Sequence, residues 1–97
     1  MDFLKQFDLT NENLEELKKF LSNEVITNLD VMRHNVVEVL TYLKDYGVEN
    51  FYDVLKYRPD LCLKEKRGLE QDLTTLDKEL LLFIFNNNID DLINFNI

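Results

Sequence analysis

Glycine and proline are scarce in this chain, and their scarcity excludes most β architectures. The 97 residues include two glycines, one proline and no alanine. Sandwiches and barrels of short strands need many tight turns, which glycine and proline commonly form. A chain of this length is enough for one domain and not for two. We therefore predict an all-α fold, in which residues 1–97 form a single compact bundle of four to five short helices arranged as helix–turn–helix units.

Cysteine and histidine are nearly absent, which leaves few kinds of reactive site. Cys62 is the only cysteine and His34 the only histidine. One thiol cannot form an internal disulfide, soft metal sites need several such ligands, and nucleophilic catalysis needs a nucleophile beside a base. Two isolated glycines cannot form a phosphate-binding loop. We therefore expect no enzymatic activity, no bound metal and no cofactor.

The two exceptions have unreactive interpretations. His34 falls on the polar side of the helix expected around it, so we predict a solvated surface histidine. Cys62 stands among leucines, which favours a small buried hydrophobe over a reactive thiol. The neighbouring Lys64 and Lys66 leave the second interpretation open, because nearby cations lower the pKa of a thiol.

Long apolar runs and the pattern of a signal peptide are also missing. The longest unbroken apolar run, Leu80 to Phe85, has six residues, whereas a bilayer-spanning helix needs about 20. Met1 is followed at once by Asp2 and an amphipathic pattern, without the basic start and apolar core of a signal peptide. We expect a soluble, cytoplasmic protein without a membrane partner, and the lone cysteine fits a reducing compartment.

Acidic residues are in excess, and the two signs of charge are unevenly distributed. Asp and Glu number 19 and Lys and Arg 11, so the formal net charge is −8. Such a surface repels phosphate backbones and favours solubility or a basic partner. Segment 56–67 is the exception, with a net charge of +3 against −11 for the remainder.

Segment 56–67 and its tyrosines have two interpretations. The basic side chains can be solubilising residues that balance the acidic majority, with the tyrosines covering the edge of the core. Alternatively they form a small patch for a partner or an anionic ligand, since exposed tyrosine near arginine is typical of interaction hot spots. So few charges would neutralise few phosphates, and binding to nucleic acid would be modest and salt-sensitive. The candidate partner-binding residues are Tyr52, Lys56, Tyr57, Arg58, Lys64, Lys66 and Arg67.

Apolar residues recur at helical spacing along most of the chain. The pattern predicts helices over about 11–22 and 30–46, a short helix that starts near Asn50 and stops at Pro59, a helix that begins at Thr74 or Thr75, and a last short turn. Between the third and fourth of these, Gly68 weakens a helix by roughly 1 kcal/mol relative to alanine. That stretch fits either a loop followed by a helix or one kinked helix.

Two apolar segments are expected to supply much of the core. The longest helix carries a stripe that ends at Gly47, where a left-handed residue belongs. Its members are Met32, Val36, Val39, Leu40 and Leu43. The run from Leu80 to Phe85 is apolar around the whole helix, so we predict that it is the most enclosed segment of the bundle.

The stretch "NVVEVLTYLKDYGVENFYDVLKYRPDLCL", residues 35–63, resembles one repeat of the mitochondrial transcription termination factor family. In that pattern a helix ends in Leu-x-x-x-Gly, a short helix follows, and the unit closes on Pro-x-Leu. The residues at the matching places are Leu43, Gly47, Val48, Leu55, Pro59 and Leu61. Members of the family stack many such repeats and bind duplex nucleic acid along a basic groove. The resemblance covers less than a third of the chain and implies a local helix–turn–helix unit.

These observations favour a non-enzymatic, acidic protein–protein interaction module of the inhibitor, immunity or adaptor type. It would act by surface complementarity on a protein partner, and its acidic surface favours a basic one. The alternative is a small nucleic-acid-associated helical-repeat protein that uses segment 56–67. A third possibility is an assembly subunit whose C-terminal segment docks onto a copy of itself.

Overall fold

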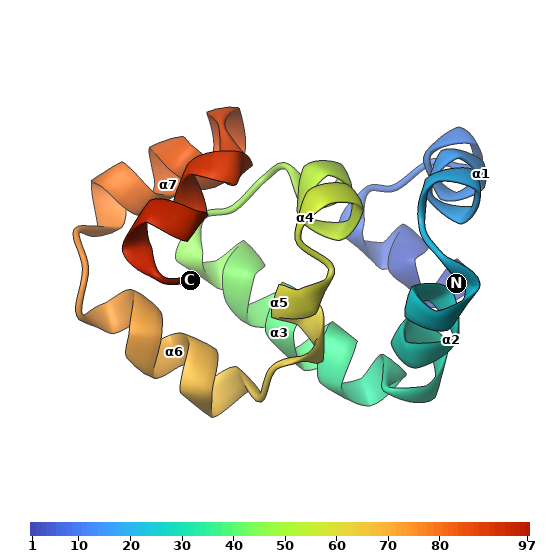
Figure 1. The fold of residues 1–97 in the computed structure, drawn as a ribbon, viewed down its shortest axis with the longest axis horizontal. Coiled ribbons are helices and arrows are strands. Elements are labelled where there is room, and N and C mark those ends of the chain that lie inside the picture. Colours follow the sequence, from blue (N-terminus) through green and yellow to red (C-terminus); the bar gives the residue numbers. More distant parts are fainter.

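Helices make up all the regular structure of the protein, and no strand is present. The computed structural model describes residues 1–97 (Figure 1). In chain order the elements are the 3-10 helix η1 (Asp2–Phe7), α1 (Asn11–Phe20), α2 (Asn23–Val31), α3 (Arg33–Tyr46), α4 (Phe51–Tyr57), α5 (Asp60–Leu63), α6 (Lys66–Thr74), α7 (Lys78–Asn87) and the 3-10 helix η2 (Ile89–Phe95). The all-α prediction is confirmed. The helices outnumber the four to five expected, because short turns such as α5 form separate elements.

Polar side chains fix the starts of four α-helices. The Thr10 hydroxyl accepts a hydrogen bond from the Asn13 backbone N–H, and the Asn13 side chain accepts one from the Thr10 N–H, so α1 begins with a reciprocal capping box. Ser22, Asn50 and Asp77 cap α2, α4 and α7 in the simpler one-bond manner. The start of α4 at Asn50 agrees with the sequence prediction, whereas the last α-helix begins later than predicted.

Helix α3 runs through the middle of the molecule, and the other elements surround it (Figure 1). It packs against η1, α2, α5 and α6, whereas α4 packs against α1 and η2. Helix α7 packs against α6 and η2. As a result α1 and α2 lie at one end of a body of 33 × 24 × 22 Å, and α6, α7 and η2 lie at the other.

The core is entirely apolar. All 24 buried residues are hydrophobic, and no polar or charged residue is buried. Burying an ionised side chain without a partner is costly, and this chain avoids that cost throughout. The whole acidic excess therefore lies on the exterior.

The long helix predicted over 30–46 is interrupted at Met32. This residue ends α2 and precedes α3 with φ −96° and ψ 25°, and its backbone N–H donates to the Asn28 carbonyl at 2.9 Å. The chain changes direction there, so Met32 leaves the predicted apolar stripe and is exposed. The other four members of the stripe are buried, as predicted.

The prediction that Leu80 to Phe85 is the most enclosed segment is wrong for the outer side of this helix. Leu81, Ile84 and Phe85 are buried, but Leu80 is 46% and Phe83 63% exposed. Helix α7 lies at the edge of the molecule, with α6 and η2 packed on its inner side, so nothing covers its outer side. Between Pro59 and Thr74 the arrangement is closest to the loop-then-helix alternative, because extended backbone at Lys64 separates α5 from α6.

One asparagine side chain fixes the turn that leads into α4. Asn86 on α7 accepts hydrogen bonds from the backbone N–H groups of Glu49, at 2.8 Å, and Asn50, at 3.3 Å. Its amide donates to the Gly47 carbonyl at 3.4 Å. These bonds span about 40 residues of sequence and set the position of α4, which carries most of the candidate site.

Candidate partner-binding site

The edges of α1 and α4 bring three aromatic rings around one lysine. The Lys56 Nζ lies 4.9 Å from the ring centroid of Phe20, 5.3 Å from that of Tyr57 and 5.5 Å from that of Tyr52. Phe20 and Tyr57 also contact each other edge to face, with their centroids 6.1 Å apart. We name these four residues the aromatic–lysine cluster. All three rings are within the roughly 6 Å at which an ammonium is attracted to an aromatic face.

Helical spacing explains why these side chains meet. Residues four apart lie on the same face of a helix. That spacing pairs Glu16 with Phe20 on α1 and Tyr52 with Lys56 on α4. The two helices pack together because their inner faces are apolar, with Leu14 and Leu17 buried on α1 and Val54 and Leu55 buried on α4.

A hydrogen bond from Tyr52 to Glu16 links the cluster to the acidic side of α1. The Tyr52 hydroxyl donates to the Glu16 carboxylate, and this bond is the main reason that the pKa of Tyr52 is raised. For Lys56, partial burial lowers the pKa, but the combined interactions with Tyr52 and Tyr57 raise it above its ordinary value. At neutral pH Tyr52 is therefore neutral and the Lys56 ammonium is charged.

The cluster is open to solvent. Phe20 is 57% and Tyr57 45% exposed, whereas Tyr52 and Lys56 are half-buried. Single exposed apolar residues are common on protein surfaces, but neighbouring exposed aromatics rimmed by polar groups mark interaction sites more often. Next to the cluster, Asn11, Glu12, Glu15, Glu16 and Lys19 line a shallow hollow on α1.

Arg58 is one of the predicted partner-binding residues, but its guanidinium is bound by other groups of the protein. Its guanidinium binds the Asp60 carboxylate through two hydrogen bonds of 3.0 Å and donates to the Ile97 carbonyl at 2.6 Å. Burial raises the pKa of Asp60, but the hydrogen bonds and charge of Arg58 outweigh that effect and lower it. Arg58 thus joins α4 and α5 to the end of the chain and is not a free cation.

The remaining basic candidates lie on another part of the surface. Lys64 connects α5 to α6, and Lys66 and Arg67 form the first turn of α6. The Asn35 amide fixes this connection by donating to the carbonyls of Cys62, at 3.0 Å, and Lys64, at 2.7 Å. Helix α6 lies on the opposite edge of the molecule from α4 (Figure 1). Segment 56–67 is therefore not one continuous basic patch.

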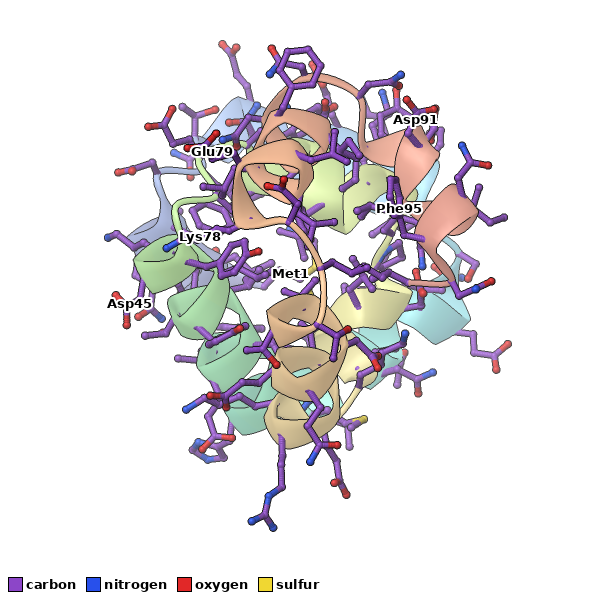
Figure 2. The ribbon with its side chains drawn as sticks, turned by 90° about the vertical axis from the view of Figure 1, so that its left-hand side faces the viewer. Met1, Asp45, Lys78, Glu79, Asp91 and Phe95 are labelled. Carbon is purple, nitrogen blue, oxygen red and sulfur yellow. The ribbon has the colours of Figure 1, made fainter.

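A simpler lysine–tyrosine contact occurs at the other end of the molecule. Lys78, at the start of α7, extends toward the end of α3 near Asp45 (Figure 2), with its Nζ 5.1 Å from the Tyr46 ring centroid. Burial raises the pKa of Tyr46 and also that of Tyr42, whose ring centroid lies 6.1 Å away. Only one ring contacts Lys78, so this site provides a natural comparison for the aromatic–lysine cluster.

His34 and Cys62, the two residues considered for catalysis, lie in different environments. His34 is exposed on α3, and Cys62 has no exposed surface. Burial, with a smaller effect from Asp60, raises the pKa of the Cys62 thiol from 9.0 to about 12. The interpretation of Cys62 as a small buried hydrophobe is supported by this environment.

We expect the folded protein to resist thiol reagents. At pH 8, a chromogenic disulfide reagent should react with Cys62 roughly 1,000-fold more slowly in the folded chain than in urea, because a thiol of raised pKa forms little thiolate. The folded chain holds this proton more tightly than the unfolded chain. The resulting stabilisation is therefore complete below about pH 9 and is lost as the pH rises toward 12. Equal reaction rates in the two states would contradict the buried position.

The structure contains neither a metal-binding cluster nor a helix suited to span a membrane. No group of three or more His, Cys, Asp or Glu side chains is placed to hold a metal ion. None of the helices combines the length and apolarity needed to cross a bilayer. No family model, curated protein or solved structure matches the chain. Helix α3, Gly47, α4 and Pro59 follow one another in the order that the resemblance implies, and the family relationship itself stays a prediction.

Tyr52, Lys56 and Tyr57 were predicted from the sequence as site residues, whereas Phe20 and Glu16 were not. One signal was available for Phe20, since it follows the buried Leu17 by three residues and falls at the margin of the apolar face of α1. Which residue it would meet on α4 depended on how the two helices pack.

Proposed function

We propose that the protein is a non-enzymatic interaction module that binds a basic protein partner in the cytoplasm. The observation that carries this proposal is the exposed aromatic pair Phe20 and Tyr57 on the α1–α4 edge. Aromatic side chains supply much of the energy at protein interfaces. Their exposure here places them where a partner can cover them.

The charge around the cluster favours a basic partner. Glu12, Glu15 and Glu16 lie on the adjoining face of α1, and the exterior as a whole carries the net charge of −8. Complementary charge speeds association and disfavours wrong partners. An inhibitor, immunity protein or adaptor acts in this way, through surface complementarity and without chemistry.

The distribution of basic residues supports a protein partner over nucleic acid. Arg58 is paired with a carboxylate, Lys56 lies among rings, and the other three cations lie near α6. Nucleic-acid affinity depends on neutralising several phosphates together, which needs cations side by side.

A matched pair of phenylalanine variants tests the proposed surface. In capture experiments with the immobilised protein and extract of the native host, Phe20→Ser should weaken capture of the specific protein partner by about 30-fold, the loss that corresponds to about 2 kcal/mol at an interface hot spot. Phe83→Ser, at a similarly exposed phenylalanine on α7, should leave capture unchanged. The bound proteins are identified by mass spectrometry, and circular dichroism checks that both variants are folded.

Two outcomes contradict the proposal. One is capture that is insensitive to Phe20→Ser or is lost equally in both variants. The other is nanomolar binding to DNA or RNA that weakens steeply with salt, which would favour the nucleic-acid alternative. Fluorescence anisotropy with labelled DNA and RNA across a salt series measures this binding.

A further inference from the structure

The aromatic–lysine cluster has the composition of a cation-binding cage. Proteins bind alkylammonium groups by surrounding them with aromatic rings, whose faces carry partial negative charge. Here Phe20 from α1 and Tyr52 and Tyr57 from α4 surround an ammonium, and that ammonium belongs to the chain itself. We propose that these rings bind a lysine side chain of the protein partner, and that Lys56 occupies the cage until the partner displaces it. This inference rests on the proposed function and adds the chemistry of its ligand.

Lys56 is held by few interactions other than the rings. Its ammonium takes part in none of the three ion pairs of the protein, and besides the Phe20 ring it interacts with the side chains of Tyr52 and Tyr57. Arg58, two residues later, has three hydrogen bonds, two of which join it to the Asp60 carboxylate with which it forms an ion pair. Lysine also has a long and flexible stem. The Lys56 head group can therefore leave the cage without disturbing the apolar core.

The rings stay in place when Lys56 leaves. Tyr52 is anchored by its hydrogen bond to Glu16, and Phe20 and Tyr57 contact each other directly. Backbone hydrogen bonds of α1 and α4 fix the positions from which the rings project. Glu16 adds a carboxylate beside the cage, which favours a cationic ligand over a neutral one of the same shape.

Occupation by Lys56 would make the cage self-inhibited. If a site is free for only a fraction of the time, its apparent Kd equals the Kd of the free site divided by that fraction. Removing the internal occupant should therefore strengthen binding of an external ammonium. A lysine that were merely one contact of the interface would show the opposite behaviour, because its removal would weaken binding or leave it unchanged.

A small lysine derivative provides a direct probe of the cage. Nα-acetyl-lysine methylamide is titrated into the full chain, and binding is followed through the ring proton signals of Phe20, Tyr52 and Tyr57 by NMR. Lys56→Gln should lower the Kd of this probe by about fivefold relative to the original chain, as expected if Lys56 fills the cage about four-fifths of the time. The same probe with an acetylated Nζ is neutral and should show no gain.

Two variants serve as controls for the titration. Lys78→Gln removes the lysine that contacts a single ring and should leave the Kd of the probe unchanged. Adding Phe20→Ser to Lys56→Gln should remove the gain, because one wall of the cage is lost. Lys78 and Phe20 are exposed and Lys56 is half-buried, and circular dichroism verifies that the helices are intact in both variants.

The result separates this inference from the proposed function. An unchanged or higher Kd for Lys56→Gln, or an equal gain for the neutral probe, would overturn the cage even if partner capture still depends on Phe20. A gain for the charged probe without any partner that depends on Phe20 would overturn the proposed function while leaving a cation site.

Discussion

Replacing Phe85 with alanine is expected to lower the free energy of unfolding by about 4 kcal/mol, the middle of the range for a buried phenylalanine. Phe85 on α7 has no exposed surface and is the largest of the fully buried side chains. Its removal takes away apolar burial and leaves a cavity, because close-packed neighbours relax only in part. Small domains have unfolding free energies of about 5–15 kcal/mol, so a loss of this size is a large fraction of the total.

Phe83 provides the matched control on the same helix. It is two residues away and 63% exposed, so Phe83→Ala should change the unfolding free energy by no more than about 0.5 kcal/mol. Urea titration followed by circular dichroism gives both values by linear extrapolation. Similar losses for the two variants would mean that the outer side of α7 is covered, contrary to the structure.

The difference between these two phenylalanines also shows where sequence reasoning stopped. In the run from Leu80 to Phe85 every position is apolar, so the helical period contains no contrast between an inner and an outer face. The run therefore predicted a helix without saying which side would be buried. Packing against α6 and η2, the elements directly before and after α7, decides that question, and the apolar run itself does not encode it.

Where apolar and polar residues alternate at helical spacing, the buried face was predicted correctly. The stripe of α3 from Val36 to Leu43 alternates with polar residues and is buried as predicted, and α4 begins after Asn50 as the sequence indicated. Met32 was misplaced because local propensity gives little warning of a change in chain direction without glycine or proline. Such turns depend on tertiary packing rather than on the residues at the turn.

The candidate site was predictable within one helix and not between helices. Tyr52, Lys56 and Tyr57 share α4, so their proximity follows from helical spacing. Phe20 and Glu16 come from α1, more than 30 residues earlier, and the sequence contains no signal of that pairing. Segment 56–67 appeared to be one basic patch, but Pro59 and the extended backbone at Lys64 direct its two halves to different surfaces.

At Gly47 the addition of a single methyl group should lower the stability of the protein substantially. Its φ of +121° lies in a region that residues with a Cβ rarely adopt. The Gly47 N–H donates to the carbonyls of Leu43 and Lys44 at 3.1 Å, and the Val48 N–H donates to that of Leu43 at 2.9 Å, which closes α3 with a Schellman motif. A Cβ at this position would also lie 3.0 Å from Cδ1 of Leu82, so α7 limits the space available.

Gly47→Ala is therefore expected to lower the free energy of unfolding by about 2 kcal/mol through backbone strain alone, with the Leu82 contact adding to the loss. Gly68→Ala is the matched control, because nothing lies within 4 Å of a Cβ built there and the residue is exposed within α6. It should raise the unfolding free energy by about 0.5 kcal/mol, since alanine favours the helix and restricts the unfolded chain. Urea titrations of the two variants measure both changes, and a loss at Gly68 equal to that at Gly47 would show that neither φ nor Leu82 is responsible.

Because Gly47 also joins α3 to the turn before α4, Gly47→Ala should shift the NMR signals of the Tyr52 and Tyr57 rings, whereas Gly68→Ala should leave them in place.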